Sequence, residues 1–170
     1  LVAAGCGDTT SNTPMDMTAA VVPHNFDQIN TQILGPSCAG FSVCHSPEGA
    51  HLANELNLGA KKLDGTANDP YAALVGAAAV NAKAASEGRL RVKPCDSADS
   101  FITIKLELAT NQDLDTGYGH YMPDTSPHLP AEQIQAIKDW IDRGALRDEP
   151  ATVTGKSGTL GPDMATATHD

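Results

Sequence analysis

The stretch from Cys38 to His51, CAGFSVCHSPEGAH, constrains the fold more than any other part of the sequence. It holds two cysteines separated by five residues, and His45 follows directly after the second, Cys44. A cysteine pair followed at once by histidine is typical of covalent haem attachment, although the usual C-x-x-C-H motif is shorter. The same residues could instead form a disulfide loop with a histidine beside it. A third interpretation is a zinc site, because Cys38, Cys44, His45 and His51 are all possible zinc ligands.

A six-coordinate haem iron needs two axial ligands, commonly an imidazole and a thioether, enclosed by apolar walls. His45 supplies the imidazole by its position after Cys44. The segment GYGHYMPDTSPHLP offers Met122 for the opposite face, and His120 lies two residues earlier. In an extended loop residues two apart point the same way, so either side chain could reach the iron. Apart from His45, we interpret each histidine, taken individually, as a solvent histidine rather than a ligand: His24, His51, His120, His128 and His169.

Two short helices are expected in the first half of the chain. Residues 25–34 place four apolar side chains on one stripe, with Asn25 as the N-cap and with Gly35 and Pro36 ending the helix. Asp69, followed by a proline, can cap a second helix, because proline at the first helical position loses no hydrogen bond. The apolar stripe of the first helix consists of Phe26, Ile29, Ile33 and Leu34.

Two further helices are expected in the second half. Residues 97–109 partly alternate between apolar and polar, which fits a helix or a strand, but Ser97 or Asp99 as an N-cap favours a helix. The strongest pattern covers 130–143, which begins with a proline and ends at Gly144. Its apolar stripe is Ile134, Ile137, Trp140 and Ile141. Because strand signals are weak, these elements predict a small all-α domain with long loops and flexible termini.

The length of 170 residues fits one folded domain with extensions at both ends. The first residues, LVAAGCGD, have the small side chains and cysteine of a bacterial lipoprotein signal, which predicts a diacylglycerol on Cys6. Residues 1–21 would then be the signal remnant and a flexible tether, and 22–146 the folded domain. Residues 147–170 lack apolar spacing and are expected to be a flexible or surface-lying tail. We therefore expect a protein anchored on the periplasmic side of a bacterial membrane.

Composition limits both the core and the partners. Three Phe, three Tyr and one Trp provide few large side chains for a core, so a buried prosthetic group would supply the missing apolar mass. The net charge is −10 and there are only 11 Lys and Arg, which argues against binding to nucleic acid. An acidic surface suits a partner protein with a basic docking patch.

Three segments resemble small class I c-type cytochromes, in particular the cytochrome-like lipoprotein domains of myxobacteria and planctomycetes. They are SCAGFSVCH (37–45), VKPCDSADSFITIKL (92–106) and YMPDTSPHLPAEQIQAIKDWIDRGA (121–145). The resemblance implies a cytochrome c-like fold with haem c as its cofactor. It also implies that Cys38 and Cys44 form the haem thioethers, with His45 and Met122 as axial iron ligands.

The resemblance further implies that the helix over 25–34 packs across the helix over 130–143, with Phe26 and Trp140 near the crossing. Cys95 is a departure, since the family usually has glycine there. If Cys6 is acylated, an odd number of thiols remains, which requires an explanation in an oxidising compartment. Cys38 could pair with Cys95, leaving one haem thioether on Cys44, or Cys95 could be buried and free.

Three functions fit these observations, and we expect the first. It is a monohaem c-type cytochrome that transfers single electrons and performs no catalysis itself, alone or as a subunit of a membrane complex. A haem enzyme such as a peroxidase would need an open distal position, so Met122 would have to be absent from the iron. The third is a haem-free, disulfide-stapled accessory lipoprotein of a larger membrane assembly.

Overall fold

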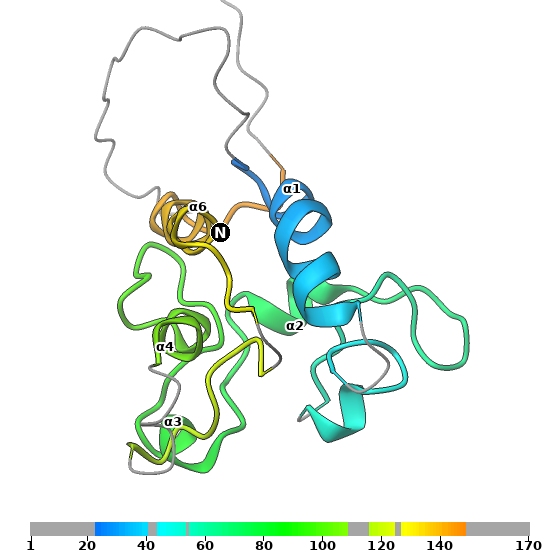
Figure 1. Ribbon diagram of the computed structural model, residues 1–170, viewed down its shortest axis with the longest axis horizontal. Helices are drawn as coiled ribbons and strands as arrows, with labels where there is room; N and C mark the ends of the chain where they lie inside the picture. Colours follow the sequence, from blue (N-terminus) through cyan, green and yellow to red (C-terminus); the bar gives the residue numbers. More distant parts are fainter. Residues whose placement is uncertain (1–22, 41–43, 54, 109–115, 125–126, 149–170) are drawn as a thin grey trace, which may run out of the picture.

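The computed structural model describes residues 23–40, 44–53, 55–108, 116–124 and 127–148. Of these residues 41% are helical, and within them the backbone forms only isolated bridges and no strand or sheet. The expected helix-rich architecture is confirmed at this level (Figure 1). The elements are α1 (Phe26–Ile29), η1 (Asn30–Ala39), η2 (Ala50–Leu52), α2 (Pro70–Leu74), α3 (Ala82–Ser86), α4 (Phe101–Glu107) and α6 (Ala131–Asp142).

The first helix begins as expected but continues further. The Asn25 side chain accepts a hydrogen bond from the Gln28 N–H at 2.9 Å, which confirms the cap. The predicted end at Gly35 and Pro36 is wrong, because α1 leads directly into the π-helix η1. A Cβ on Gly35 would lie 2.8 Å from the Asn30 carbonyl oxygen, so a larger residue there would require the backbone of this wider helical turn to shift. Because η1 continues past Gly35, Cys38 lies inside a helix.

Helix α6 packs across α1 at the centre of the core. The Phe26 and Trp140 rings lie 5.8 Å apart between centroids, which confirms the expected crossing. The indole N–H of Trp140 donates to the Leu146 carbonyl at 2.8 Å. Helix α6 ends two residues before Gly144, the predicted end signal, whose φ is 105°. The largest fully buried apolar side chains are Trp140, Ile29, Leu34, Leu74, Ile137, Ile141 and Val92.

Helices α2 and α4 lie beside this pair. Asp69 caps α2 as predicted, accepting from the Ala72 N–H at 3.2 Å. The predicted caps of α4 are wrong, because the helix begins after Ser100. Ser97 is used elsewhere: its N–H and hydroxyl donate to the Asp142 carboxylate at 2.8 and 2.9 Å, which ties this turn to α6.

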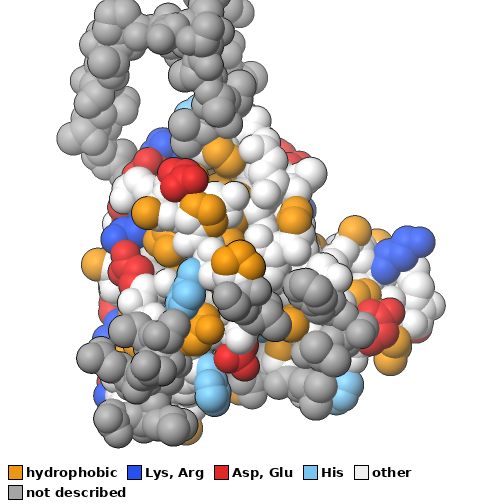
Figure 2. Space-filling model, in the orientation of Figure 1, with side chains coloured by type: hydrophobic (Ala, Val, Ile, Leu, Met, Phe, Trp, Pro, Cys, Tyr) orange, Lys and Arg blue, Asp and Glu red, His pale blue; other side chains and the backbone are white. Residues whose placement is uncertain are grey.

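Helix α3 was not predicted, because its alanine-rich sequence has no apolar stripe. Residues 60–67 form an exposed projection between η2 and α2, closed by a bridge from Lys61 to Ala67 (Figures 1 and 2). The predicted tether 1–21 and most of the tail 147–170 lie outside the described residues. Arg147 is described, and its guanidinium pairs with Asp69 and lies over the Tyr71 ring. No helix in the described ranges is both long and apolar enough to cross a bilayer.

Candidate functional site

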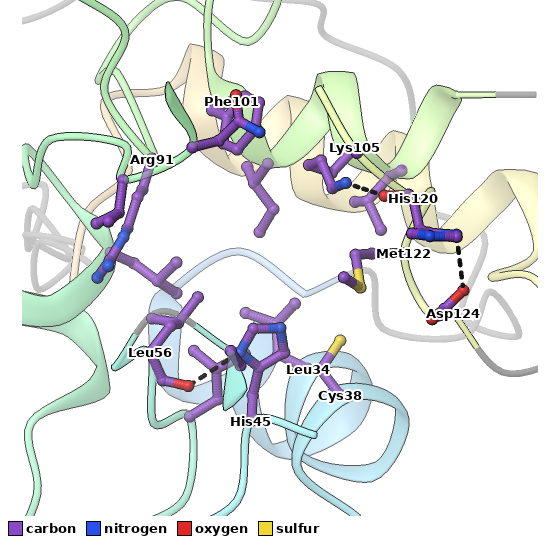
Figure 3. A pocket seen from close by; sticks show the side chains of 18 of the residues that line it. Leu34, Cys38, His45, Leu56, Arg91, Phe101, Lys105, His120, Met122 and Asp124 are labelled. Atoms are coloured by element: carbon purple, nitrogen blue, oxygen red, sulfur yellow. Dashed lines mark hydrogen bonds and ion pairs between the residues drawn. The ribbon is translucent and has the colours of Figure 1, made fainter. Parts of the chain in front are cut away.

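A cavity of about 300 Å³ lies between η1, the segment that follows it, α4 and the loop before α6. Its walls are mainly apolar, and a few polar side chains reach it from different parts of the chain (Figure 3). This volume lies at the lower end of the range for ligand pockets, about 300–1,000 Å³. The apolar walls include Leu34, Leu56, Leu58, Leu74, Phe101, Ile102 and Leu106.

His45 is held in place by its neighbours on this wall. Its Nδ1 lies 2.9 Å from the Leu56 carbonyl oxygen. A carbonyl only accepts, so Nδ1 carries the proton and the lone pair is on Nε2. The His45 N–H donates to the Cys38 carbonyl at 3.0 Å, and the His45 carbonyl accepts from the Leu58 N–H at 2.7 Å. The imidazole is therefore fixed with one nitrogen available for a ligand.

The surroundings of His45 favour its neutral form. Burial lowers the pKa of this imidazole, and the positive charges of Arg91 and Lys105 lower it further. The hydrogen bond to the Leu56 carbonyl acts in the opposite direction. Only a neutral imidazole can ligate a metal, so the environment of His45 suits that role.

Met122 and His120 were the two alternatives predicted for the second iron ligand, opposite His45. Met122 is half-buried and lines the cavity, and in Figure 3 its thioether points toward the space that His45 also faces. His120 also borders the cavity, but its side chain is 62% exposed and its Nδ1 lies 3.7 Å from the Asp124 carboxylate. Of these two side chains Met122 is therefore the more buried, and the His120 side chain is mainly exposed.

The two thiols of the motif are both free, and they differ in environment. Cys38 is buried and lines the cavity. Burial, together with the nearby Cys44 thiol, raises the pKa of Cys38 to about 12. Cys44 is half-buried and does not belong to the cavity lining of the described residues. The geometry thus brings Cys38, His45 and Met122 around one cavity, with Cys44 adjacent to it.

Cys95 does not behave as either alternative proposed for it. It is exposed and disulfide-bonded, whereas Cys38 is free, so a Cys38–Cys95 pair and a buried free Cys95 are both wrong. Its φ is 66°, in the left-handed region that favours glycine. Cys95 thus adopts a backbone conformation that glycine reaches without strain.

The zinc interpretation of the motif is not supported. Within the described residues no cluster of three or more His, Cys, Asp or Glu side chains could hold a metal ion, and His51 is exposed. His24 is exposed as expected, and His169 lies outside the described residues. His128 is half-buried rather than fully exposed, and its ring stacks on Tyr121 with 4.0 Å between ring centroids.

Sequence reasoning missed two cations that line the cavity, Arg91 and Lys105. Arg91 donates to the Ala73 carbonyl at 2.8 Å. Lys105 lies on α4, within the segment 92–106, but no role was predicted for it from the sequence. Leu56 was missed as well, because it orients His45 through its backbone carbonyl, a group that every residue type has. These residues meet the motif only through the tertiary fold.

A scan against protein-family models found no match to the chain, and comparisons with curated proteins and with solved structures found none either. The functional assignment therefore rests on the chemistry of the motif and on the geometry of the cavity.

Proposed function

We propose that this protein is a monohaem c-type cytochrome with a small cytochrome c-like domain, and that it transfers single electrons. The observation that supports this most directly is the placement of His45 and Met122. An imidazole whose Nδ1 is tied to a carbonyl and a thioether face the same apolar cavity of about 300 Å³. Imidazole and thioether are the ligand pair that electron-transfer haem commonly uses.

The donor set of the site fits haem c. The bound group would supply one-electron iron chemistry. The thiols of Cys38 and Cys44 can each add S–H across a haem vinyl group to give a thioether, a step that needs no oxidant. Cys38 faces the cavity directly, and Cys44 lies six positions along the chain next to His45. The two free thiols support attachment better than a disulfide between them.

The other lining residues have roles consistent with electron transfer. The Leu56 carbonyl fixes the His45 ring, and a hydrogen-bonded histidine is a more basic ligand. The apolar walls exclude water, which favours a higher reduction potential. The guanidinium of Arg91 can pair with a haem carboxylate. Met122 at the cavity argues for a carrier rather than a peroxidase, which needs an open distal position.

Two wider features of the proposal concern location and partner. The disulfide at Cys95 fits the oxidising periplasmic side of a bacterial membrane, and Cys6, where the sequence predicts a lipid anchor, lies outside the described residues. A net charge of −10 would steer the protein toward a redox partner with a basic docking patch. A short encounter with such a partner, alone or within a membrane complex, suits a protein that only passes electrons.

The first test is a visible spectrum of the protein produced in an export host with cytochrome maturation machinery. We expect a Soret band and a sharp α band after dithionite reduction, and the pyridine haemochrome should report thioether links. If the purified protein lacks Soret absorption, the proposal is wrong and a haem-free accessory lipoprotein is the better account.

The axial ligands are tested by His45→Ala, with His51→Ala as the matched control from the same motif. We expect His45→Ala to lose the low-spin spectrum, and His51→Ala to keep it because His51 is exposed. Met122→Ala should open the distal position and lower the reduction potential. A normal low-spin spectrum in His45→Ala would reject the ligand assignment, and an unaffected Met122→Ala would shift it to His120.

A further inference from the structure

We propose that Lys105 is a positioning residue that holds the distal loop, residues 116–122, so that the Met122 thioether faces His45. The proposal rests on the proposed function, because it concerns the ligand loop of the same site. Nothing in the residue types around Lys105 indicates this role, which depends on contacts between α4 and the loop.

Lys105 holds the distal loop through both its backbone and its side chain. Its carbonyl accepts a hydrogen bond from the Met122 N–H at 2.9 Å. Its Nζ donates to the Tyr118 carbonyl at 3.0 Å and to the His120 carbonyl (Figure 3). Lys105 therefore contacts the main chain of residues 118, 120 and 122, and the last of these is the proposed iron ligand.

Lys105 lies on a packed helix, whereas the distal loop that it contacts contains two glycines. Lys105 belongs to α4, whose Thr103 and Leu106 are buried. The distal loop contains Gly117 and Gly119, with φ of 78° and 77°. Glycine loses more backbone freedom on ordering than other residues do, so a loop with two glycines needs fixed partners to keep one conformation. The lysine on the helix supplies such partners close to Met122.

The beginning of the distal loop has separate anchors on and next to α3. The Lys83 Nζ donates to the Thr116 carbonyl at 2.7 Å, and the Asn81 side chain donates to the Gly117 carbonyl at 3.3 Å. The Tyr118 hydroxyl donates to Glu87 at 2.6 Å. These contacts keep the loop on the protein when the Lys105 amine is removed. The Lys105 contacts are nearer to Met122, so their loss should act on ligation more than on folding.

The test uses Lys105→Met in the haem-loaded protein, because methionine keeps the length of the side chain and removes its donors. We expect the sulfur-to-iron(III) charge-transfer absorption to weaken. We also expect imidazole to bind the ferric protein about tenfold more tightly, equivalent to about 1.4 kcal/mol, because Met122 competes less well for the iron. Lys105→Arg, which retains charged donors, should restore both properties at least in part.

Two further measurements separate positioning from other effects. Lys138→Met is the matched control, since the Lys138 amine also has a fixed partner, the Glu107 carboxylate at 2.7 Å, and none of its hydrogen bonds or ion pairs given for the described residues reaches the distal loop. In the haem-free protein, Lys105→Met should speed amide hydrogen exchange at 116–122, while Lys138→Met should not. The reduction potential alone is a poor readout, because removing any nearby positive charge lowers it.

An unchanged charge-transfer band and unchanged imidazole affinity in Lys105→Met would overturn the proposal. If this variant fails to fold, Lys105→Gln provides the same test with a polar side chain, and wild-type behaviour in it would count equally against the proposal. Failure of the proposed function has a different signature. In that case the wild-type protein itself would lack haem, or would lack the charge-transfer band.

Discussion

His45 is constrained at three of its polar atoms. Its N–H, its carbonyl and its Nδ1 contact Cys38, Leu58 and Leu56 respectively, at 3.0, 2.7 and 2.9 Å. Each contact is to a backbone group, so the imidazole orientation depends on the course of the chain after the motif. This arrangement explains how a motif with a wider cysteine gap can still present Nε2 to the cavity.

The two motif cysteines should differ in reactivity in the haem-free protein. The thiolate is the nucleophile, and the pKa of Cys38 is raised by burial to about 12. A raised pKa leaves little thiolate at a pH of about 8.5, near the ordinary value for cysteine. We therefore expect iodoacetamide to modify Cys44 before Cys38, as measured by mass spectrometry of the peptides, and Cys38 labelling to increase on unfolding.

Cys44→Ser and Cys38→Ser provide the controls for this experiment, since each leaves one motif thiol. Labelling of Cys38 at the same rate as Cys44 in the folded protein would show that Cys38 is not buried. The same peptide maps would identify the disulfide partner of Cys95 and show whether Cys6 carries the predicted diacylglycerol.

At the scale of elements, the π-helix η1 connects the core to the motif. It runs through Gly35 and Pro36 and buries Ile33, Leu34 and Cys38. Leu34 and Cys38 also line the cavity, so the same element supports the core on one side and the site on the other. A helix ending at Gly35 would have left Cys38 in a loop.

Gly35→Ala tests whether the wide turn depends on the missing side chain. The new Cβ would lie 2.8 Å from the Asn30 carbonyl oxygen, so the backbone must shift. We expect the free energy of unfolding to fall by about 1–2 kcal/mol, since overpacking outweighs the helix propensity that alanine gains. Chemical denaturation measures the difference.

Thr31→Ala is the control for Gly35→Ala, because Thr31 is exposed in the same element. Surface substitutions of this kind change stability by less than about 0.5 kcal/mol. A Gly35→Ala variant as stable as Thr31→Ala, with unchanged haem attachment, would contradict a close approach at Gly35.

The whole molecule combines a small core with a cavity beside it. The Phe26–Trp140 contact lies at the crossing of α1 and α6, and Phe26 also packs edge-on against Tyr71 with 5.3 Å between centroids. The cavity of about 300 Å³ adjoins this core through Leu34 and Leu74. A chain with so few aromatic residues thus leaves a sizeable apolar space next to its core.

Filling this space should stabilise the fold. A bound apolar group would remove the apolar cavity walls from water, and burial of apolar surface stabilises the folded state. We expect the same chain made without cytochrome maturation machinery to unfold at a clearly lower denaturant concentration than the haem-loaded chain. Comparing the two forms requires no mutation, and equal midpoints would show that the cavity does not depend on a bound group.

The sequence alone determined the features that rest on local chemistry. The Asn25 and Asp69 caps and the two apolar stripes were predictable, because capping and helical periodicity act over a few neighbouring residues. The helix over 97–109 was anticipated, but its cap was wrong, because Ser97 bonds to Asp142 on a distant helix. The motif also identified the thiols and the imidazole as candidate site residues.

Only the tertiary structure decided which candidates meet. Both Met122 and His120 border the cavity, but Met122 is half-buried whereas the His120 side chain is mainly exposed and lies near Asp124. The fold also supplied the Leu56 carbonyl that selects the His45 nitrogen. It also brought Lys105 to the distal loop. These contacts join residues far apart in the chain, and several use backbone atoms that every residue type shares, so no local pattern could have revealed them.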